Sequence, residues 1–342
     1  MVQRLVPAVA LFGLAAAFLT GEPAQADKAV KFPIVGDKTH KSYVETIPES
    51  KVKFEMIAIP GGTYLMGSPA SEKGRKDDEG PQHPVTVKGF WMAKCELTWD
   101  EFDTYWRGRP GKKEDKEPEN PKDADAVTRP TPAYADETFG LGREGNPLIA
   151  VSHHTAMQYC RWLTLKTGKL YRLPTEAEWE WAARAGTTSA YYFGDDPKAL
   201  GEHAWYQPNA EDKPQPVGKK KPNPWGLHDM YGNVAEFCLD HYKADYYASF
   251  PTDRPTLQPV NRPTNARFSH VVRGGSWADE APACRSAARV GSDKSWLKLD
   301  PQRPQSIWWL TSAEHIGFRI VRPIEEQENL KGVRSLITRE SK

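Results

Sequence analysis

The sequence predicts an irregular, loop-rich fold in which large aromatic side chains hold short helices and short strands together. Its composition supports this, because 342 residues include 12 Trp, 29 Pro and 26 Gly. The segment RLPTEAEWEWAARAG at 172–186 reads as a short helix that carries two indoles. A helix of this length is marginal in water, so we expect the rest of the chain to enclose it.

The ends of this helix are marked by local signals. Thr175 followed by Glu178 forms a capping box, in which the Thr hydroxyl accepts from the Glu amide and the Glu carboxylate accepts from the Thr amide. Glu176 adds negative charge to the first turn, where the helix dipole favours it. Arg184 in the last turn and Gly186 after it predict where the helix ends.

The first 26 residues have the pattern of an export signal. A positive start at Arg4 precedes an apolar run over 5–20 and an Ala24-Gln25-Ala26 cleavage site. The apolar run is short for a bilayer span, and no Cys precedes Cys95 that could carry a lipid anchor. We expect a periplasmic or secreted protein, cleaved near Ala26, with no membrane span.

The remaining composition says little about partners. The net charge of +1 gives no argument for a nucleic-acid partner, and the oligomeric state is left open. The chain has no Gly-rich phosphate loop, no G-x-S-x-G elbow and no CxxC pair. Adjacent His153 and His154 are expected to point apart, a poor start for a shared metal.

Hydrophobic patterns and turn residues divide the rest of the chain. Residues 54–59 read as a strand that ends at Pro60-Gly61-Gly62, and Val85 to Met92 as a second strand with a bulge at Gly89. Thr98 and Glu101 form another capping box and open a short helix.

A second set of segments follows the same reasoning. Ser152 caps a helix that ends at Gly168 and places Cys160 on its buried stripe. The other expected segments are a polar arm at 27–50, a polar insertion at 107–147, strands at 271–277 and 316–321, an ordered crossing loop at 290–315, and a charged tail at 324–342.

Seven blocks of sequence over 54–323 resemble, in order, the formylglycine-generating enzyme (sulfatase-modifying factor) family. Besides RLPTEAEWEWAARAG, they are IPGGTYLMGS, DDEGPQHPVTVKGFWM, CELTWDEF, NPWGLHDMYGNVAEF, VVRGGSWADEAPACRSAAR and IGFRIVRP. The resemblance implies one α+β domain over 51–323, of C-type-lectin-like ancestry. We prefer this to the two domains that the length alone suggests.

The resemblance also raises a question about copper. In the family, two cysteines five positions apart bind Cu(I), which activates O2 for the oxidation of a sulfatase cysteine to formylglycine. Here the second position is Cys284 but the first is Asp279, and Ser276 matches the family's active-site serine. Soft thiolates suit Cu(I), and a carboxylate is too hard to replace one. Cys284 is therefore either a packed relic or a reactive thiol, and copper is not expected.

Calcium is expected from the same resemblance. In the family, a calcium ion is held by the positions that match Asp229, Gly232, Val234 and Glu236. Two carboxylates and backbone carbonyls on a tight Gly-containing loop suit a hard cation. The alternative is a turn whose acids cap neighbouring amides. The family has Trp at the position of Ala235, so the neighbouring cleft surface is expected to differ.

Four cysteines allow three pairings, so disulfides have to be considered. Cys160 matches a family cysteine whose partner position is Ile320 here, so the family disulfide is not expected. We predict mostly free, buried thiols.

Two functions remain open. The first is a calcium-stabilised binding or accessory domain, possessing the fold without the copper dithiolate, with a peptide or protein partner. The second is an O2-dependent oxidoreductase that forms formylglycine or performs a related oxidation with Cys284 and Ser276. The residue at position 279 favours the first function.

Overall fold

The computed structural model describes residues 34–35, 40–107, 124, 127–133 and 135–341. The predicted export signal and residues 108–123, 125–126 and 134 of the polar insertion lie outside the described residues. No helix in the described ranges is long and apolar enough to cross a membrane.

The described strands form three sheets of four strands each. The first has the order β1 (Ile34–Val35), β4 (Gly61–Met66), β5 (His83–Val87), β8 (Thr256–Leu257). The second has the order β12 (Val321–Pro323), β6 (Phe90–Ala93), β3 (Lys53–Ile59), β2 (Tyr43–Thr46). The third has the order β10 (Arg289–Gly291), β9 (His270–Arg273), β7 (Ala235–His241), β11 (Ile316–Gly317).

Most neighbouring strands are antiparallel. The β5–β8 and β11–β7 pairs are parallel. The helices are α1 (Trp99–Trp106), α2 (His153–Thr167), α3 (Glu176–Arg184) and the short α4 (Leu200–His203). Short 3-10 turns occur at Asp77–Glu79, Pro197–Ala199, Tyr246–Ser249, Ala281–Cys284, Lys294–Leu297 and Glu328–Leu330. This mixture of few helices, short strands and long loops confirms the predicted α+β class.

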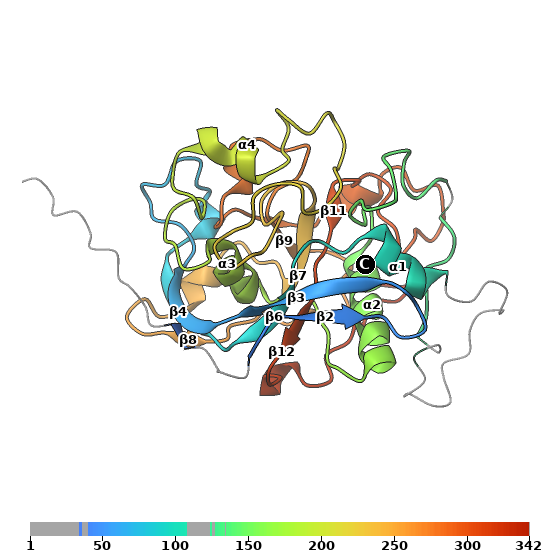
Figure 1. Cartoon of the computed structure of the whole chain (residues 1–342), viewed down its shortest axis with the longest axis horizontal. Coiled ribbons are helices and arrows are strands. Elements are labelled where there is room, and N and C mark those ends of the chain that lie inside the picture. The colour runs from blue at the N-terminus through green and yellow to red at the C-terminus, as the bar shows by residue number, and fades with distance from the viewer. Residues whose placement is uncertain (1–33, 36–39, 108–123, 125–126, 134, 342) are drawn as a thin grey trace, which may run out of the picture. The chain divides into compact units, whose positions relative to one another are not determined.

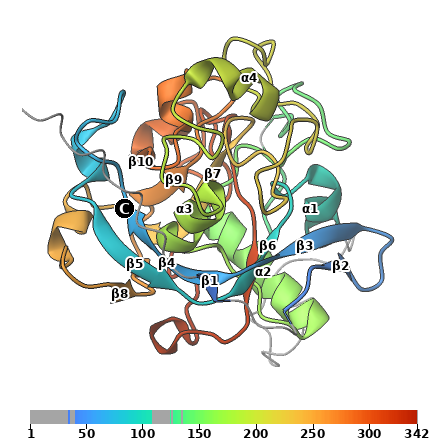
Figure 2. The ribbon, with the colours of Figure 1, turned by 60° about the vertical axis from the view of Figure 1, so that its left-hand side comes forward.

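Helix α3 lies in the middle of this arrangement, as Figures 1 and 2 show. It contacts β4 and β5 on one side and β7 and β9 on the other. Every residue from Glu176 to Arg184 is buried. The prediction that the chain encloses this helix is therefore confirmed.

The core around α1 and α2 is aromatic, as the composition predicted. Ring contacts between 5.3 and 6.5 Å link residues within α1 and residues far apart in sequence. The buried members are Trp99, Phe102, Tyr105, Tyr159, Trp162 and Trp309. Together they fix α1 and α2 against the segment that precedes β11.

Two predicted strands are each divided between sheets. Residues 85–92 do not form one bulged strand, because β5 and β6 belong to different sheets and Lys88-Gly89 connects them. The chain also forms a strand at Gly61–Met66, where the sequence suggested only a strand end. Residues 316–321 are likewise split into β11 and the start of β12. Local alternation does not reveal which partner a strand will choose.

The domain extends beyond the predicted 51–323 at both ends. Strand β2, within the expected polar arm, pairs with β3. Leu330 and Ile337, within the expected charged tail, are buried. Apolar side chains in these mostly polar segments therefore fasten them to the domain.

Candidate functional site

The signals at the ends of α3 act as predicted. Thr175 Oγ1 accepts from the amide of Glu178, and the Glu178 carboxylate accepts from the amide of Thr175 at 2.9 Å. The left-handed residue that caps the helix is Ala185, with φ 46°, one position before Gly186 at φ 88°. The helix ends where the sequence placed it.

Each glutamate of α3 pairs with arginine inside the protein. Glu178 receives two hydrogen bonds from Arg172, at 2.7 and 2.9 Å. Glu176 pairs with Arg289, and Glu180 pairs with Arg184 and Arg273. The charges on this buried helix are therefore neutralised by partners, as burial requires.

The segment that holds the predicted catalytic residues passes the Trp179 ring of α3. Gly274 has φ +94°, and a Cβ there would lie 3.1 Å from the Trp179 ring. Gly275 has φ +65°, and a Cβ there would lie 2.8 Å from Cys284 Sγ. Only glycine fits these two positions, and they fold the segment back so that Ser276 lies close to the Ala281–Cys284 turn.

Asp279 and Ser276 contact one another at this turn. Ser276 is buried, and its Oγ donates to Asp279 Oδ2 at 2.6 Å. Cys284 is completely buried. Burial raises the pKa of its thiol, and the nearby Asp279 carboxylate raises it further. The structure thus brings the three predicted residues together, but with a protonated thiol and an occupied serine hydroxyl.

This arrangement does not fit the family's copper site. Cu(I) prefers a pair of soft thiolates, and here the position that would supply the second thiolate is the carboxylate of Asp279. Among the described residues, no group of three or more His, Cys, Asp or Glu side chains is arranged to hold a metal. All four cysteines are free, and three of them are buried, which agrees with the predicted thiols.

Glu236, a predicted calcium ligand, is the centre of a second cluster. It is 1% exposed, and both of its oxygens accept from Arg319, at 2.6 to 2.8 Å. Its Oε2 also accepts from Trp179 Nε1 at 2.7 Å. Arg319 therefore competes with any cation for this carboxylate.

Asp229, the other predicted carboxylate ligand, has a free oxygen. Its Oδ2 accepts from the amide of Gly218 at 2.6 Å, whereas its buried Oδ1 has no hydrogen-bond partner. Burial raises the pKa of Asp229, and the charge of Glu236 contributes. An unpaired buried carboxylate oxygen is what a missing cation would leave.

Glu96 was not singled out from the sequence, yet it completes this cluster. It is 1% exposed and accepts from the amide of Val234 and from Asn233 Nδ2, both at 3.1 Å. Burial raises the pKa of Glu96 strongly, and the charges of Asp229 and Glu236 raise it further. Three buried carboxyl groups therefore share one nearby guanidinium, that of Arg319.

Of the four predicted positions, Asp229 has a free carboxylate oxygen, which is the kind of ligand that a hard cation prefers. The local excess of negative charge favours a cation there. Glu236 already forms an ion pair with Arg319, so its role as a calcium ligand stays a prediction. Glu96 and Arg319 lie in the quoted blocks CELTWDEF and IGFRIVRP, and counting buried charges in those blocks could have found them.

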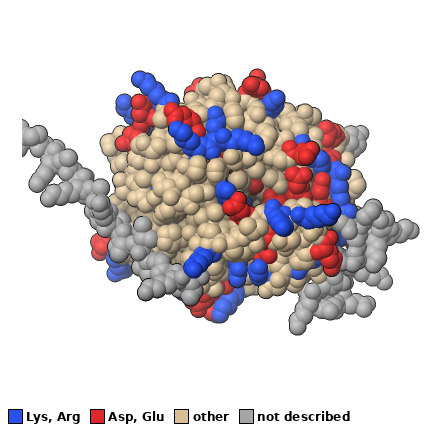
Figure 3. Space-filling view, in the orientation of Figure 1, with Lys and Arg blue, Asp and Glu red and all other residues tan. Residues whose placement is uncertain are grey.

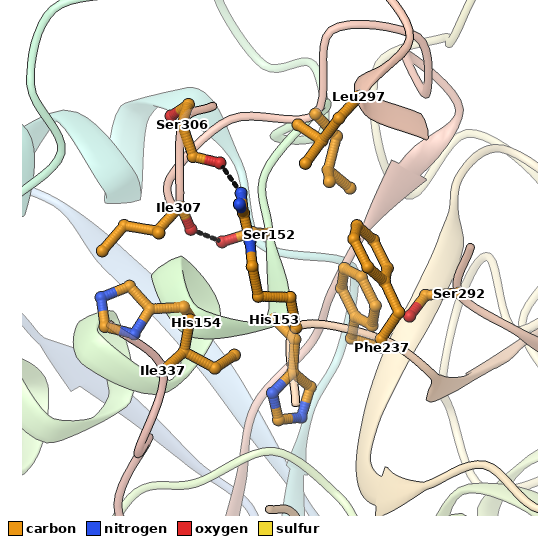
Figure 4. Close-up of a pocket in the computed structure, with 12 residues that line it drawn as sticks. Ser152, His153, His154, Phe237, Ser292, Leu297, Ser306, Ile307 and Ile337 are labelled. Carbon is orange, nitrogen blue, oxygen red and sulfur yellow. Dashed lines mark hydrogen bonds between the residues drawn. The ribbon is translucent and has the colours of Figure 1, made fainter. Parts of the chain in front are cut away.

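A small pocket at the start of α2 was also missed. Figure 4 shows His153 and His154 pointing apart, as the sequence suggested, with Phe237 and Leu297 beside them. The ring of His153 stacks on His270, with 3.7 Å between centroids and 2° between planes. The cavity has a volume of about 10 Å³, which is room for one water rather than a ligand.

Comparison with known sequences and structures shows to which family the chain belongs. The chain is 31% identical over 304 residues to the formylglycine-generating enzyme of Thermomonospora curvata, covering 77% of this chain and 92% of that one. The solved structure of PvdO from Pseudomonas aeruginosa is 27% identical, with a TM-score of 0.61 over 82% of this chain and 98% of that one. Treponema denticola variable protein 1, at 22% identity, shares the fold with a TM-score of 0.58 over 82% of this chain and 99% of that one. The profile of the sulfatase-modifying factor enzyme 1-like domain matches residues 43–324, and the chain belongs to that family.

Proposed function

We propose that this chain is an exported binding or accessory domain of the formylglycine-generating enzyme family that lacks copper-dependent oxidation. The observation that most supports this is the contact between Ser276 and Asp279 beside Cys284, the only thiol among the described residues of this buried site. Oxidation in the family needs a soft ligand pair, and this site offers one thiol and one hard oxygen.

The ligand of such a domain is proposed to be a peptide. Gly274, Gly275, Ser276, Trp277 and Arg285 match the pattern that surrounds the peptide site in the family. Arg285 is held in place by Glu79, which accepts at 2.6 and 2.7 Å. Because these surrounding residues are present and the second thiol is not, we expect the protein to bind a peptide without oxidising it.

We expect the wild-type protein to leave a sulfatase-type Cys-x-Pro-x-Arg peptide unoxidised. The peptide is incubated with Cu(I), reductant and O2, and its mass is measured for conversion of the thiol to an aldehyde. Asp279→Cys should bind Cu(I) at least about tenfold more tightly than wild type in a chromophore competition assay, because it restores a second soft ligand. Asp253→Cys, which places a thiol at an exposed position, should not.

Conversion of the peptide by the wild type would contradict this proposal. It would favour the alternative, an oxidoreductase that uses Cys284 without a second thiolate. Cu(I) binding of equal strength in Asp279→Cys and Asp253→Cys would show that position 279 is not what controls the copper site.

We further propose that calcium stabilises the domain at the loop of Asp229. The buried, unpaired Oδ1 and the excess negative charge of Glu96, Asp229 and Glu236 support it. A ligand that binds only the folded state at 100 times its Kd adds about 2.7 kcal/mol to the free energy of unfolding. The melting temperature should therefore be higher in calcium than in chelator.

Asp229→Ala should remove this difference, whereas Asp253→Ala, at an exposed position, should preserve it. Because Glu236 also pairs with Arg319, a substitution there would destabilise the fold with or without calcium. Equal melting of the wild type in both buffers, with no calcium in elemental analysis, would rule out the site.

Export is proposed from the segment that ends at Ala24-Gln25-Ala26. Intact-mass measurement of the protein from its native host should give a chain that begins after Ala26. A mature species that begins at Met1 would contradict it.

A further inference from the structure

The described residues enclose a cavity of about 420 Å³ between α2 and the last part of the chain. This volume lies in the range of small-molecule sites. Met157, Leu165, Leu173 and Leu239 give it apolar surface, and Leu170, which is 40% exposed, lies among its lining residues. The cavity is separate from the turn of Asp279 and from the loop of Asp229.

One wall of the cavity consists of residues 326–335, which lie beyond the range 43–324 that the family profile matches. This wall is attached at several points. Leu330 is 3% exposed, and the Ser335 hydroxyl lies 2.8 Å from His154 Nδ1. Glu326 accepts from Arg172 Nε at 3.3 Å. The wall is thus part of the folded domain.

The charges around the cavity are predominantly positive. Its lining includes Arg161, Arg172, Lys331 and Arg334 but only one acid, Glu326. Two of these cations already have carboxylate partners. Arg172 pairs with both Glu178 and Glu326. Lys331 pairs with Glu328.

Arg161 and Arg334 have no carboxylate within ion-pair distance among the residues that the structure describes. A guanidinium that lines an apolar cavity without a carboxylate partner favours an anion.

We propose that this cavity binds an amphiphilic monocarboxylate, a fatty acid of medium length. The apolar chain lies against Met157, Leu173 and Leu239, and the carboxylate pairs with Arg161 or Arg334. Burial of the chain removes apolar surface from water, and the charge complementarity sets the orientation of the ligand.

The test uses sodium decanoate below its critical micelle concentration, titrated into the full chain by calorimetry. Decanoate should bind with a stoichiometry of one, and decylammonium at least tenfold more weakly, because the two share the chain but differ in the sign of the head. The double variant Arg161→Glu/Arg334→Glu should weaken decanoate binding at least tenfold. Arg254→Glu, which changes an exposed arginine elsewhere, should leave it unchanged.

Val333→Trp fills the cavity from its outer wall and should abolish binding while far-UV circular dichroism stays that of the wild type. If the charge-reversed variant fails to fold, Val333→Trp and the comparison with decylammonium still decide the result. Non-saturable uptake of decanoate, equal affinity for both probes, or full binding by a folded Val333→Trp protein would overturn the proposal.

Discussion

Replacing Arg319 with Ala is expected to lower the free energy of unfolding by about 3–5 kcal/mol, the usual result of removing one partner of a buried ion pair. Arg319 is completely buried and contacts both oxygens of Glu236. It also donates to the carbonyls of His228 and Asp229, at 3.0 and 3.1 Å. Its loss leaves Glu236 buried and unpaired, close to Glu96.

The measurement is equilibrium unfolding in urea, with Arg322→Ala as the control. Arg322 lies three residues further along the chain, where its guanidinium covers the Trp91 ring at 4.7 Å on a partly exposed surface. That contact is worth about 1 kcal/mol. Arg319→Met combined with Glu236→Gln should lose less than the two single variants together, because neither charge is left alone. Equal losses from Arg319→Ala and Arg322→Ala would contradict the role given to the pair.

The stacked pair His153 and His270 is expected to make the protein sensitive to acid. Burial lowers the pKa of His270 to about 3 and that of His154 to about 4, and it lowers the pKa of His153 strongly. His153 Nε2 contacts the carbonyl of Cys238 at 3.1 Å, and His270 Nε2 contacts that of Ala266 at 3.2 Å. These contacts raise the two pKa values, but burial lowers them more and favours the neutral rings.

The direction of the effect follows from these pKa values. An unfolded His takes up a proton below about pH 6.5, whereas folded His270 stays neutral to about pH 3. The contribution of His270 to the free energy of unfolding is therefore complete above about pH 6.5. It falls by about 1.4 kcal/mol for each pH unit below that value. Asp240, whose pKa burial raises to about 8, has the opposite effect in the same range. Because the two effects overlap, the effect of His270 is measured as the difference in pH dependence between the wild type and a His270 variant.

His270→Gln replaces the imidazole with an amide, which can donate to the Ala266 carbonyl but is not protonated in this pH range. Its free energy of unfolding, measured from pH 6.5 to about 4.5, should fall less steeply than that of the wild type by about 1.4 kcal/mol per pH unit. His203→Gln, at a more exposed ring, is the control and should change the slope much less. Parallel curves for wild type and His270→Gln would show that this ring does not titrate on unfolding.

Local sequence signals predicted the helices well. The strands were predicted less well, because strand pairing depends on residues far apart in the sequence. Thr98, Ser152 and Thr175 cap helices as expected, because a cap is decided within three or four residues. The Lys88-Gly89 link was interpreted as a bulge, because the sequence does not reveal that β5 and β6 join different sheets.

In the candidate site, too, contacts within one segment could be predicted and contacts between distant segments could not. Asp279, Ser276 and Cys284 lie within one short segment, and the structure brings them together as the spacing implied. Arg319 lies 83 positions from Glu236, between apolar residues, so its pairing could not be seen from either segment alone. The same holds for His153 and His270, which meet only because β9 passes the start of α2.

The ion pairs of α3 also have a consequence for how the chain folds during synthesis. Glu176 and Glu180 are made 113 and 93 residues before their partners Arg289 and Arg273. Until those arginines have left the ribosome, burying the helix would leave carboxylates unpaired in an apolar interior. The central helix can therefore settle only when nearly all of the domain is present, so folding is expected to proceed as one late, cooperative event.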